Sequence, residues 1–348
     1  MAVSYTASRV LDAYPGLDAT QVEARLTYGS FASLRDRFVY VEVPKAASTT
    51  MKTLIRELYG SAPLKLFIHY YRESHRRSFL HARENIPLPS LNALHRKDQQ
   101  ELLEAADVLR FAIVRNPYAR LVSAWRDKIF LCDPSVDDVY AAVRGIAPAL
   151  ERKKPVQFAE FVSYIERGSS RVWNEHWRRQ VDLTFPRAIP FTHIGKVEDL
   201  DSTLEIVSRH LGYQETISAP RANEQAIKPC ARFSKEIAER LYAIYQDDFV
   251  NFGYDPQSWP RDEQALPGIV SEERLVEEVM ERNVIITNLY NERDRLIREN
   301  DSVYRFSFAR MRNKLSGVLQ SLRPIMSFVI SDVRALLEHL TPHSHSRP

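Results

Sequence analysis

The sequence has few of the residues that mark disulfide-rich, metal-binding or membrane-spanning proteins. Its 348 residues include two cysteines, Cys132 and Cys230, and neither belongs to a C-x-x-C or Cys/His cluster. Two isolated cysteines cannot build a disulfide framework, and they do not suggest a zinc site. No apolar run approaches the roughly 20 residues of a spanning helix, and the first ten residues lack a signal-peptide core. We therefore expect a soluble, cytoplasmic protein that binds no metal.

An excess of charge of one sign is also absent. The chain carries 48 basic and 45 acidic residues, a net charge of +3, which is too close to neutral to predict a nucleic-acid-binding protein. Any anion site must therefore be a local cluster of basic residues. With 44% hydrophobic residues the chain can bury a substantial core, and its length suggests about two structural units.

Apolar runs alternate with helical patterns through the central part of the chain. The runs F-V-Y-V-E-V (38–43), L-R-F-A-I-V (109–114) and I-P-F-T-H-I-G-K-V (189–197) have the composition of buried strands. Helical spacing follows them, and it is also expected over 158–167, 170–180 and 234–245. This alternation predicts an α/β fold with a parallel sheet flanked by helices.

The predicted organisation has four parts. They are an N-terminal helical lead-in (1–36), a central domain (37–258), a linker (259–270) and a C-terminal helical extension (271–348). In the extension, a seven-residue spacing connects Val276, Asn283, Tyr290, Ile297 and Tyr304, with Asn283 as the register-setting polar position. This spacing predicts a short coiled coil and a homo-oligomer. A helix packed on its own domain is the alternative. The basic, apolar segment 304–340 indicates a second helix pair or peripheral membrane contact.

A lysine and a run of small residues follow the first predicted strand, in V-P-K-A-A-S-T-T (43–50). The stretch lacks the glycines of the triphosphate loop G-x-x-x-x-G-K-[ST]. Small residues let backbone N–H groups approach an anion, the helix N-terminus adds partial positive charge, and Lys45 adds a full one. An ordinary Ser or Thr N-cap is the alternative interpretation.

The second predicted strand ends in a similar way, in V-R-N-P-Y-A-R-L-V-S-A-W-R-D-K (114–128). Arg115 follows the carboxyl end of the strand, where open α/β sheets bind ligands. Ser123 lies about two helical turns later, and an arginine with a hydroxyl makes a good phosphate site. The alternative is that Arg115 pairs with Asp127 or with a surface carboxylate.

Together these stretches resemble sulfotransferases that use 3′-phosphoadenosine 5′-phosphosulfate (PAPS). P-K-A-A-S-T-T resembles their P-loop-like 5′-phosphosulfate loop, and V-R-N-P-Y-A-R-L-V-S their 3′-phosphate motif. The similarity continues through N-E-H-W (174–177) and H-I-G-K-V-E-D-L (193–200) to L-Y-A-I-Y-Q-D-D-F-V-N-F-G-Y (241–254). It is greatest to carbohydrate sulfotransferases of the chondroitin and heparan uronyl types.

The resemblance implies a PAPS site. Lys45 would hold the 5′-phosphosulfate together with the backbone of Ala46, Ala47, Ser48, Thr49 and Thr50. Arg115 and Ser123 would hold the 3′-phosphate, and Arg221 would contact the nucleotide from a closing loop. The sequence departs from Golgi relatives of this family in two ways. It lacks their N-terminal anchor, which puts Golgi localisation in doubt, and Thr50-Met51 replaces the common Asn-Trp, which leaves the backbone cradle unaffected.

The implied reaction is in-line transfer of a sulfuryl group to a carbohydrate hydroxyl, in which Lys45 neutralises the leaving oxygen. A histidine is the expected general base. We expect His81, which lies between the two PAPS motifs, and His176 is its rival.

The acceptor is expected to be a carbohydrate, and an anionic one would suit the basic residues near His81, which are Arg72, Arg76, Arg77 and Arg83. The competing functions are a P-loop kinase, for which no convincing Walker-B acidic residue is found, and an inactive nucleotide-fold scaffold. The retention of Lys45, Arg115 and Ser123 argues against the scaffold.

Overall fold

The protein is described here by a computed structural model that covers residues 3–60, 86–130, 156–168, 174–217 and 233–260. It also describes positions 133, 136, 139, 142, 143, 295 and 298. The chain divides into two units, Met1–Thr287 and Asn288–Pro348. All helices and strands named below belong to the first unit. Among the described residues, no helix combines the length and the apolar character needed to cross a membrane.

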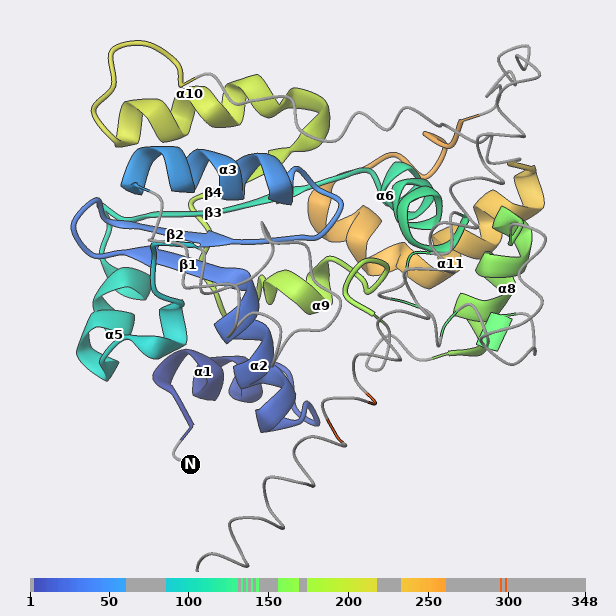
Figure 1. Ribbon diagram of the computed structural model, residues 1–348, viewed down its shortest axis with the longest axis horizontal. Helices are drawn as coiled ribbons and strands as arrows, with labels where there is room; N and C mark the ends of the chain where they lie inside the picture. Colours follow the sequence, from blue (N-terminus) through green and yellow to red (C-terminus); the bar gives the residue numbers. More distant parts are fainter. Residues whose placement is uncertain are drawn as a thin grey trace, which may run out of the picture. The chain divides into compact units, whose positions relative to one another are not determined.

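A four-stranded sheet organises this unit (Figure 1). Its strands follow the order β1 (Ser30–Ser33), β2 (Phe38–Val41), β3 (Leu109–Val114) and β4 (His193–Lys196). Strands β2, β3 and β4 run parallel, and β1 pairs antiparallel with β2. The predicted α/β class with a parallel sheet flanked by helices is confirmed.

Helices cover both faces of the sheet, as Figure 1 shows. On one face lie α3 (Ser48–Tyr59) and α10 (Leu200–His210). On the other face lie α1 (Tyr5–Ala13), α2 (Ala19–Gly29) and α5 (Arg96–Glu104). Alternate residues of β2 serve the two faces, since Tyr40 packs with α3 and α10 while Val39 packs with α1 and α2. Both faces are therefore buried, as a parallel sheet requires.

A third group of helices packs beyond the carboxyl ends of the parallel strands. It comprises α6 (Pro117–Ala124), a π-helical turn (Trp125–Phe130), α8 (Phe158–Arg167) and α11 (Lys235–Phe252). These helices share one apolar cluster, in which Trp125 and Trp177 are each 1% exposed. Shorter pieces connect the larger elements, namely a 3-10 turn (Leu91–Ala93), α9 (Val181–Thr184) and a 3-10 turn (Val197–Asp199).

Two local predictions were wrong. Residues 30–33, which were placed in the helical lead-in, form strand β1, although α1 and α2 confirm the helical character of the rest. The helix predicted over 170–180 is instead a series of turns at 174–180. The Asn174 side chain accepts a hydrogen bond from the His176 backbone N–H, and such side-chain bonds compete with helix formation.

Other predicted strand and helix boundaries differ from the observed ones by a few residues. The third predicted strand shortens to β4, and the helix predicted over 234–245 continues to Phe252 as α11. The tail over 304–340 lies outside the described residues, as do the linker beyond Pro260 and the predicted coiled coil apart from Arg295 and Arg298, which are helical. Between residues 86 and 98 the chain forms a 3-10 turn and the start of α5.

Candidate active site

Two strand–helix junctions meet at one edge of the sheet. The chain passes from β2 through residues 42–47 into α3, and from β3 through Arg115 and Asn116 into α6 (Figure 1). Because β2 and β3 are parallel neighbours, both junctions lie at their carboxyl ends, the edge at which α/β sheets bind ligands.

The first junction is a tight loop with a left-handed backbone at two positions. Lys45 has a φ of 68° and Ala47 a φ of 57°. Ala47 is the N-cap of α3, and its side chain makes no capping hydrogen bond. The alternative of an ordinary Ser or Thr N-cap is therefore wrong, and the amino end of α3 presents backbone N–H groups and partial positive charge instead.

A buried ion pair connects the two ends of this loop. Lys52 of α3 lies 2.7 Å from the Glu42 carboxylate, which follows β2, and the two side chains are 2% and 5% exposed. A pair buried this deeply fixes the relative placement of its two elements, since breaking it would leave a lone charge in the core. The strand and helix on either side of Lys45 are thus held together.

Lys45 points toward the π-helical turn that follows α6. Its Nζ lies 2.9 Å from Oδ2 of Asp127, and the lysine side chain is 15% exposed. Burial lowers the pKa of Lys45, and the Asp127 charge opposes this shift. For the Asp127 carboxyl, burial raises the pKa, but the charges of Lys45 and Lys128 outweigh burial and leave the pKa lowered. The ion pair therefore holds the Lys45 ammonium group in a fixed place.

Arg115 joins the second junction to the first. Its Nη1 donates to the Lys45 carbonyl oxygen at 3.4 Å. Its backbone is held on both sides by Gln180, whose Oε1 accepts from the Arg115 N–H at 2.9 Å and whose Nε2 donates to the Arg115 carbonyl at 2.8 Å. The alternative pairing of Arg115 with Asp127 is therefore wrong, because Lys45 holds that carboxylate. Two predicted site residues, Lys45 and Arg115, are brought together.

Ser123 lies on α6, half-buried and near its carboxyl end. Helical spacing places it between Arg120 and Asp127 on one side of the helix and its π-helical continuation. Asp127 in turn contacts Lys45. The predicted hydroxyl thus lies on the side of α6 that faces the first junction.

His176 faces the same group of charges from the turns at 174–180. Its Nδ1 lies 2.6 Å from Oδ1 of Asn174, and that oxygen also accepts from the His176 backbone N–H at 3.0 Å. A backbone N–H can only donate, so the shared atom is the amide oxygen, and Nδ1 must carry the ring proton. The atom of His176 that can accept a proton is therefore Nε2.

The surroundings of His176 keep its ring neutral. Burial and the positive charges of Lys128 and Lys45 lower the pKa of His176 well below its ordinary value, against the opposing charge of Asp127. A neutral imidazole with an unprotonated Nε2 can accept a proton at neutral pH.

Three functional candidates were missed from the sequence. Asp127 was considered only as a partner of Arg115, although it follows the 3′-phosphate motif directly in R-D-K. Asn174 precedes His176 by two residues, which is the spacing of an Asx turn and could have been noticed. Gln180 carried no local signal, because its role depends on contacts distant in the sequence.

Several predicted residues lie outside the described part of the chain. They are His81, Arg221 and the arginines near His81, namely Arg72, Arg76, Arg77 and Arg83. The roles predicted for them stay predictions.

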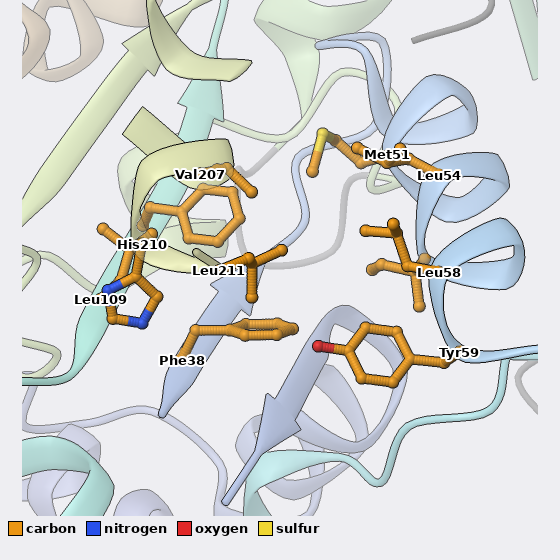
Figure 2. Close-up of a pocket in the computed structure, with 11 residues that line it drawn as sticks. Phe38, Met51, Leu54, Leu58, Tyr59, Leu109, Val207, His210 and Leu211 are labelled. Atoms are coloured by element: carbon orange, nitrogen blue, oxygen red, sulfur yellow. The ribbon is translucent and has the colours of Figure 1, made fainter. Parts of the chain in front are cut away.

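A hollow between α3 and α10 lies at the other end of the strands (Figure 2). It is lined by Phe38 and Leu109 at the starts of β2 and β3 and by Tyr59 at the end of α3. Its volume of about 20 Å³ admits roughly one water molecule. This apolar hollow belongs to the core packing and not to the charged site.

The family comparison agrees with this geometry. The family model described as "Sulfotransferase family" matches residues 29–255, from the end of α2 to just beyond α11. This span contains both strand–helix junctions, the turns at 174–180 and all four strands.

Named relatives cover a similar share of the chain. Carbohydrate sulfotransferase 10 of Xenopus laevis is 28% identical over 248 residues, which is 64% of this chain and 66% of that protein. Carbohydrate sulfotransferase 10 of Homo sapiens is 27% identical over 70% of this chain and 71% of that protein. Carbohydrate sulfotransferase 11 of Danio rerio is 28% identical over 64% and 65% of the two chains. The chain thus spans about two thirds of the length of these relatives.

No solved structure matches the chain closely enough to be informative. The family match covers well over half of the chain and includes every residue of the charged site described above. The chain therefore belongs to the sulfotransferase family.

Proposed function

We propose that this protein transfers a sulfuryl group from PAPS to a hydroxyl group of a carbohydrate acceptor. One observation carries the proposal. Lys45, in a left-handed loop at the amino end of α3, lies beside Arg115 at the end of the neighbouring parallel strand. Two cations at such an edge suit a ligand with two separate anionic groups. The names of the relatives support a carbohydrate as the acceptor.

The donor is proposed to bind across the two junctions. Lys45 and the backbone N–H groups of Ala47, Ser48, Thr49 and Thr50 would hold the 5′-phosphosulfate, whereas the Ala46 N–H already donates to the Val43 carbonyl at 3.1 Å and closes the turn. Arg115 and Ser123 would hold the 3′-phosphate, since the guanidinium fork and a hydroxyl match a dianionic phosphate. Arg221 is expected to complete this site from the loop that contains it.

In the proposed reaction the acceptor oxygen attacks sulfur in line. The new oxygen–sulfur bond forms as the bond between sulfur and the bridging phosphate oxygen breaks, and adenosine 3′,5′-bisphosphate leaves. Lys45 would shift from Asp127 to the bridging oxygen and neutralise its developing charge. The hydroxyl proton would pass to a histidine, and Nε2 of His176 has the tautomer and the neutral state that this step needs. His81 stays the other candidate base.

The charges around this site favour an anionic acceptor. The positive charges of Lys128, Lys45 and Arg120 all lower the pKa of His176, and the charge of Asp127 opposes them. Of the competing functions, neither the P-loop kinase nor the inactive scaffold is supported by the family comparison. Cytoplasmic localisation, a homo-oligomer through the C-terminal extension and peripheral membrane contact stay predictions.

The proposal is tested by sulfate transfer from radiolabelled PAPS to a panel of carbohydrate acceptors. Lys45→Ala should reduce turnover by about 100-fold or more, because it removes the cation beside the leaving oxygen. Lys97→Ala changes an exposed lysine of α5 on the far side of the sheet, and it should behave like the unmodified protein. A full transfer rate in Lys45→Ala would disprove the assignment of the site.

A further inference from the structure

We propose that Arg25 and Arg120 are positioning residues that hold two segments in one fixed arrangement. The segments are the Lys45 loop (residues 42–47) and the His176 turn (residues 174–180). The inference rests on the proposed function, since it assigns the donor to the loop and proton transfer to the turn. It adds two arginines that would contact neither the donor nor the proton that is transferred.

Arg25 reaches both segments from α2, on the N-terminal side of the fold. Its side chain is 3% exposed. Nη2 donates to the Glu42 carbonyl at the start of the loop, and Nε donates to the Leu183 carbonyl at 3.1 Å. Nη1 donates to Oε2 of Glu175 at 3.1 Å. One guanidinium thus connects the residue after β2 to the residue before His176.

Arg120 makes the same kind of connection from α6. It is 2% exposed. Nε donates to the Pro44 carbonyl, next to Lys45, at 2.9 Å. Nη2 donates to the Glu175 carbonyl at 2.8 Å, and Nη1 donates to the Arg178 carbonyl at 2.7 Å. Both arginines therefore converge on Glu175, one on its carboxylate and one on its backbone.

The placement of these bonds indicates a role in catalysis as well as in folding. Burying a guanidinium is costly unless its donors are satisfied. Here the acceptors are mostly carbonyls of the two segments that carry Lys45 and His176, and these segments are far apart in the sequence. Burial lowers the pKa of Arg120 to about 10, so it remains a cation at neutral pH. The planar fork of arginine suits such multiple contacts, and lysine cannot replace it.

Gly29 supplies independent support for a fixed position of Arg25. A Cβ atom at Gly29 would lie 2.1 Å from Nη1 of Arg25. The Gly29 carbonyl also accepts from the Glu42 N–H at 2.8 Å. Because the last residue of α2 has no side chain, the guanidinium can occupy this space beside the start of the loop. Gly29→Ala should displace the guanidinium while keeping residue 25 an arginine.

The first test compares Arg25→Lys and Gly29→Ala with Arg9→Lys. Arg9 is a matched control, since it donates from α1 to the Ala188 carbonyl but has no bond to the loop. We expect Arg25→Lys and Gly29→Ala to lower turnover by about 10- to 100-fold, as a small misplacement of reacting groups does. The Kd for adenosine 3′,5′-bisphosphate should change far less. Normal turnover in Arg25→Lys and Gly29→Ala would overturn the proposal, and so would a change in Kd as large as the change in turnover.

The second test does not depend on activity. Amide hydrogen exchange over residues 174–180 is measured with and without adenosine 3′,5′-bisphosphate. Binding should slow exchange there in the unmodified protein and not in Gly29→Ala, although both bind the nucleotide. Equal protection in the two proteins would overturn the proposal. A failure of the unmodified protein to bind the bisphosphate would instead count against the proposed function.

Discussion

At the scale of single residues, the site depends on hydrogen bonds that decide where protons are. Asn174 is the clearest case, because its oxygen fixes the proton of His176 on Nδ1 and leaves Nε2 as the basic atom. Lys45 is another, because its charge is held beside the loop by Asp127. These two contacts turn ordinary side chains into a candidate base and a candidate stabiliser of the leaving group.

Asn174→Asp should shift the pH dependence of turnover. A carboxylate beside Nδ1 favours the imidazolium and raises the pKa of His176. Since a base must be neutral, the acidic limb of kcat/KM should move to higher pH. The charged groups already facing the ring are Lys45, Lys128, Arg120 and Asp127.

The measurement is a pH–rate profile of Asn174→Asp, with His81→Ala as the comparison. An unmoved acidic limb in Asn174→Asp together with lost turnover in His81→Ala would assign the base to His81.

Sequence reasoning at this scale correctly brought together two residues that each follow a strand, and their roles stay predictions. Lys45 and Arg115 were predicted as site residues on that ground, and they do meet. The contact between Asp127 and Lys45 was not predicted, because it depends on how α6 and its π-helical turn pack, and Asp127 was considered only as an alternative partner of Arg115. The roles of Arg25 and Gln180 could not be predicted, since their partners lie far away in the sequence.

At the scale of elements, the loop between β2 and α3 is the part most sensitive to change. Residues other than glycine adopt a left-handed backbone at a cost of about 1–2 kcal/mol. Lys45 and Ala47 both do so, and the buried pair of Glu42 and Lys52 helps to hold them there.

Substitutions of Ala47 test this strain. Ala47→Val should lower the free energy of unfolding by about 1–3 kcal/mol, because a β-branched side chain is poorly tolerated at a positive φ. It should also weaken nucleotide binding. Ala47→Gly should raise stability slightly or leave it unchanged, since glycine adopts this backbone readily. Urea denaturation measures the stability of both variants, and equal stabilities for the valine and glycine variants would contradict the account.

Elements with a strong local pattern were predicted, and those that depend on a partner were not. The strands β2 and β3 are continuous apolar runs, and α3 and α10 have clear helical faces, so each was found. Strand β1 is four residues long and exists through its pairing with β2. The residues at 174–180 have a helical pattern in sequence. In the structure the carbonyls of Glu175 and Arg178 accept hydrogen bonds from Arg120 instead of from a helical backbone.

At the scale of the whole molecule, α11 supports the site through one buried carboxylate. Asp248 is fully buried and accepts from the backbone N–H groups of Gln180 and Val181 at 2.8 and 2.9 Å. Gln180 in turn holds the backbone of Arg115. Burial raises the pKa of Asp248 from 3.8 to about 6.

Asp248 should therefore make stability depend on pH. Between pH 3.8 and about 6 the native protein binds more protons at this carboxyl than the unfolded chain does. Its contribution to the free energy of unfolding is full below pH 3.8 and falls by about 3 kcal/mol as pH rises through 6. Asp248→Asn should remove this part of the slope in denaturation curves collected across that range. A slope unchanged by the substitution would contradict the assignment.

The central claim is that the edge formed by β2 and β3 binds a nucleotide through two separate phosphate sites. The most direct measurement is calorimetric titration with adenosine 3′,5′-bisphosphate and with adenosine 5′-phosphate. The unmodified protein should bind the bisphosphate at least about tenfold more tightly, since a charge-assisted contact to the 3′-phosphate is worth about 1.5–3 kcal/mol. Arg115→Ala should remove this preference. Equal affinities in the unmodified protein, or a preference that survives Arg115→Ala, would contradict the account.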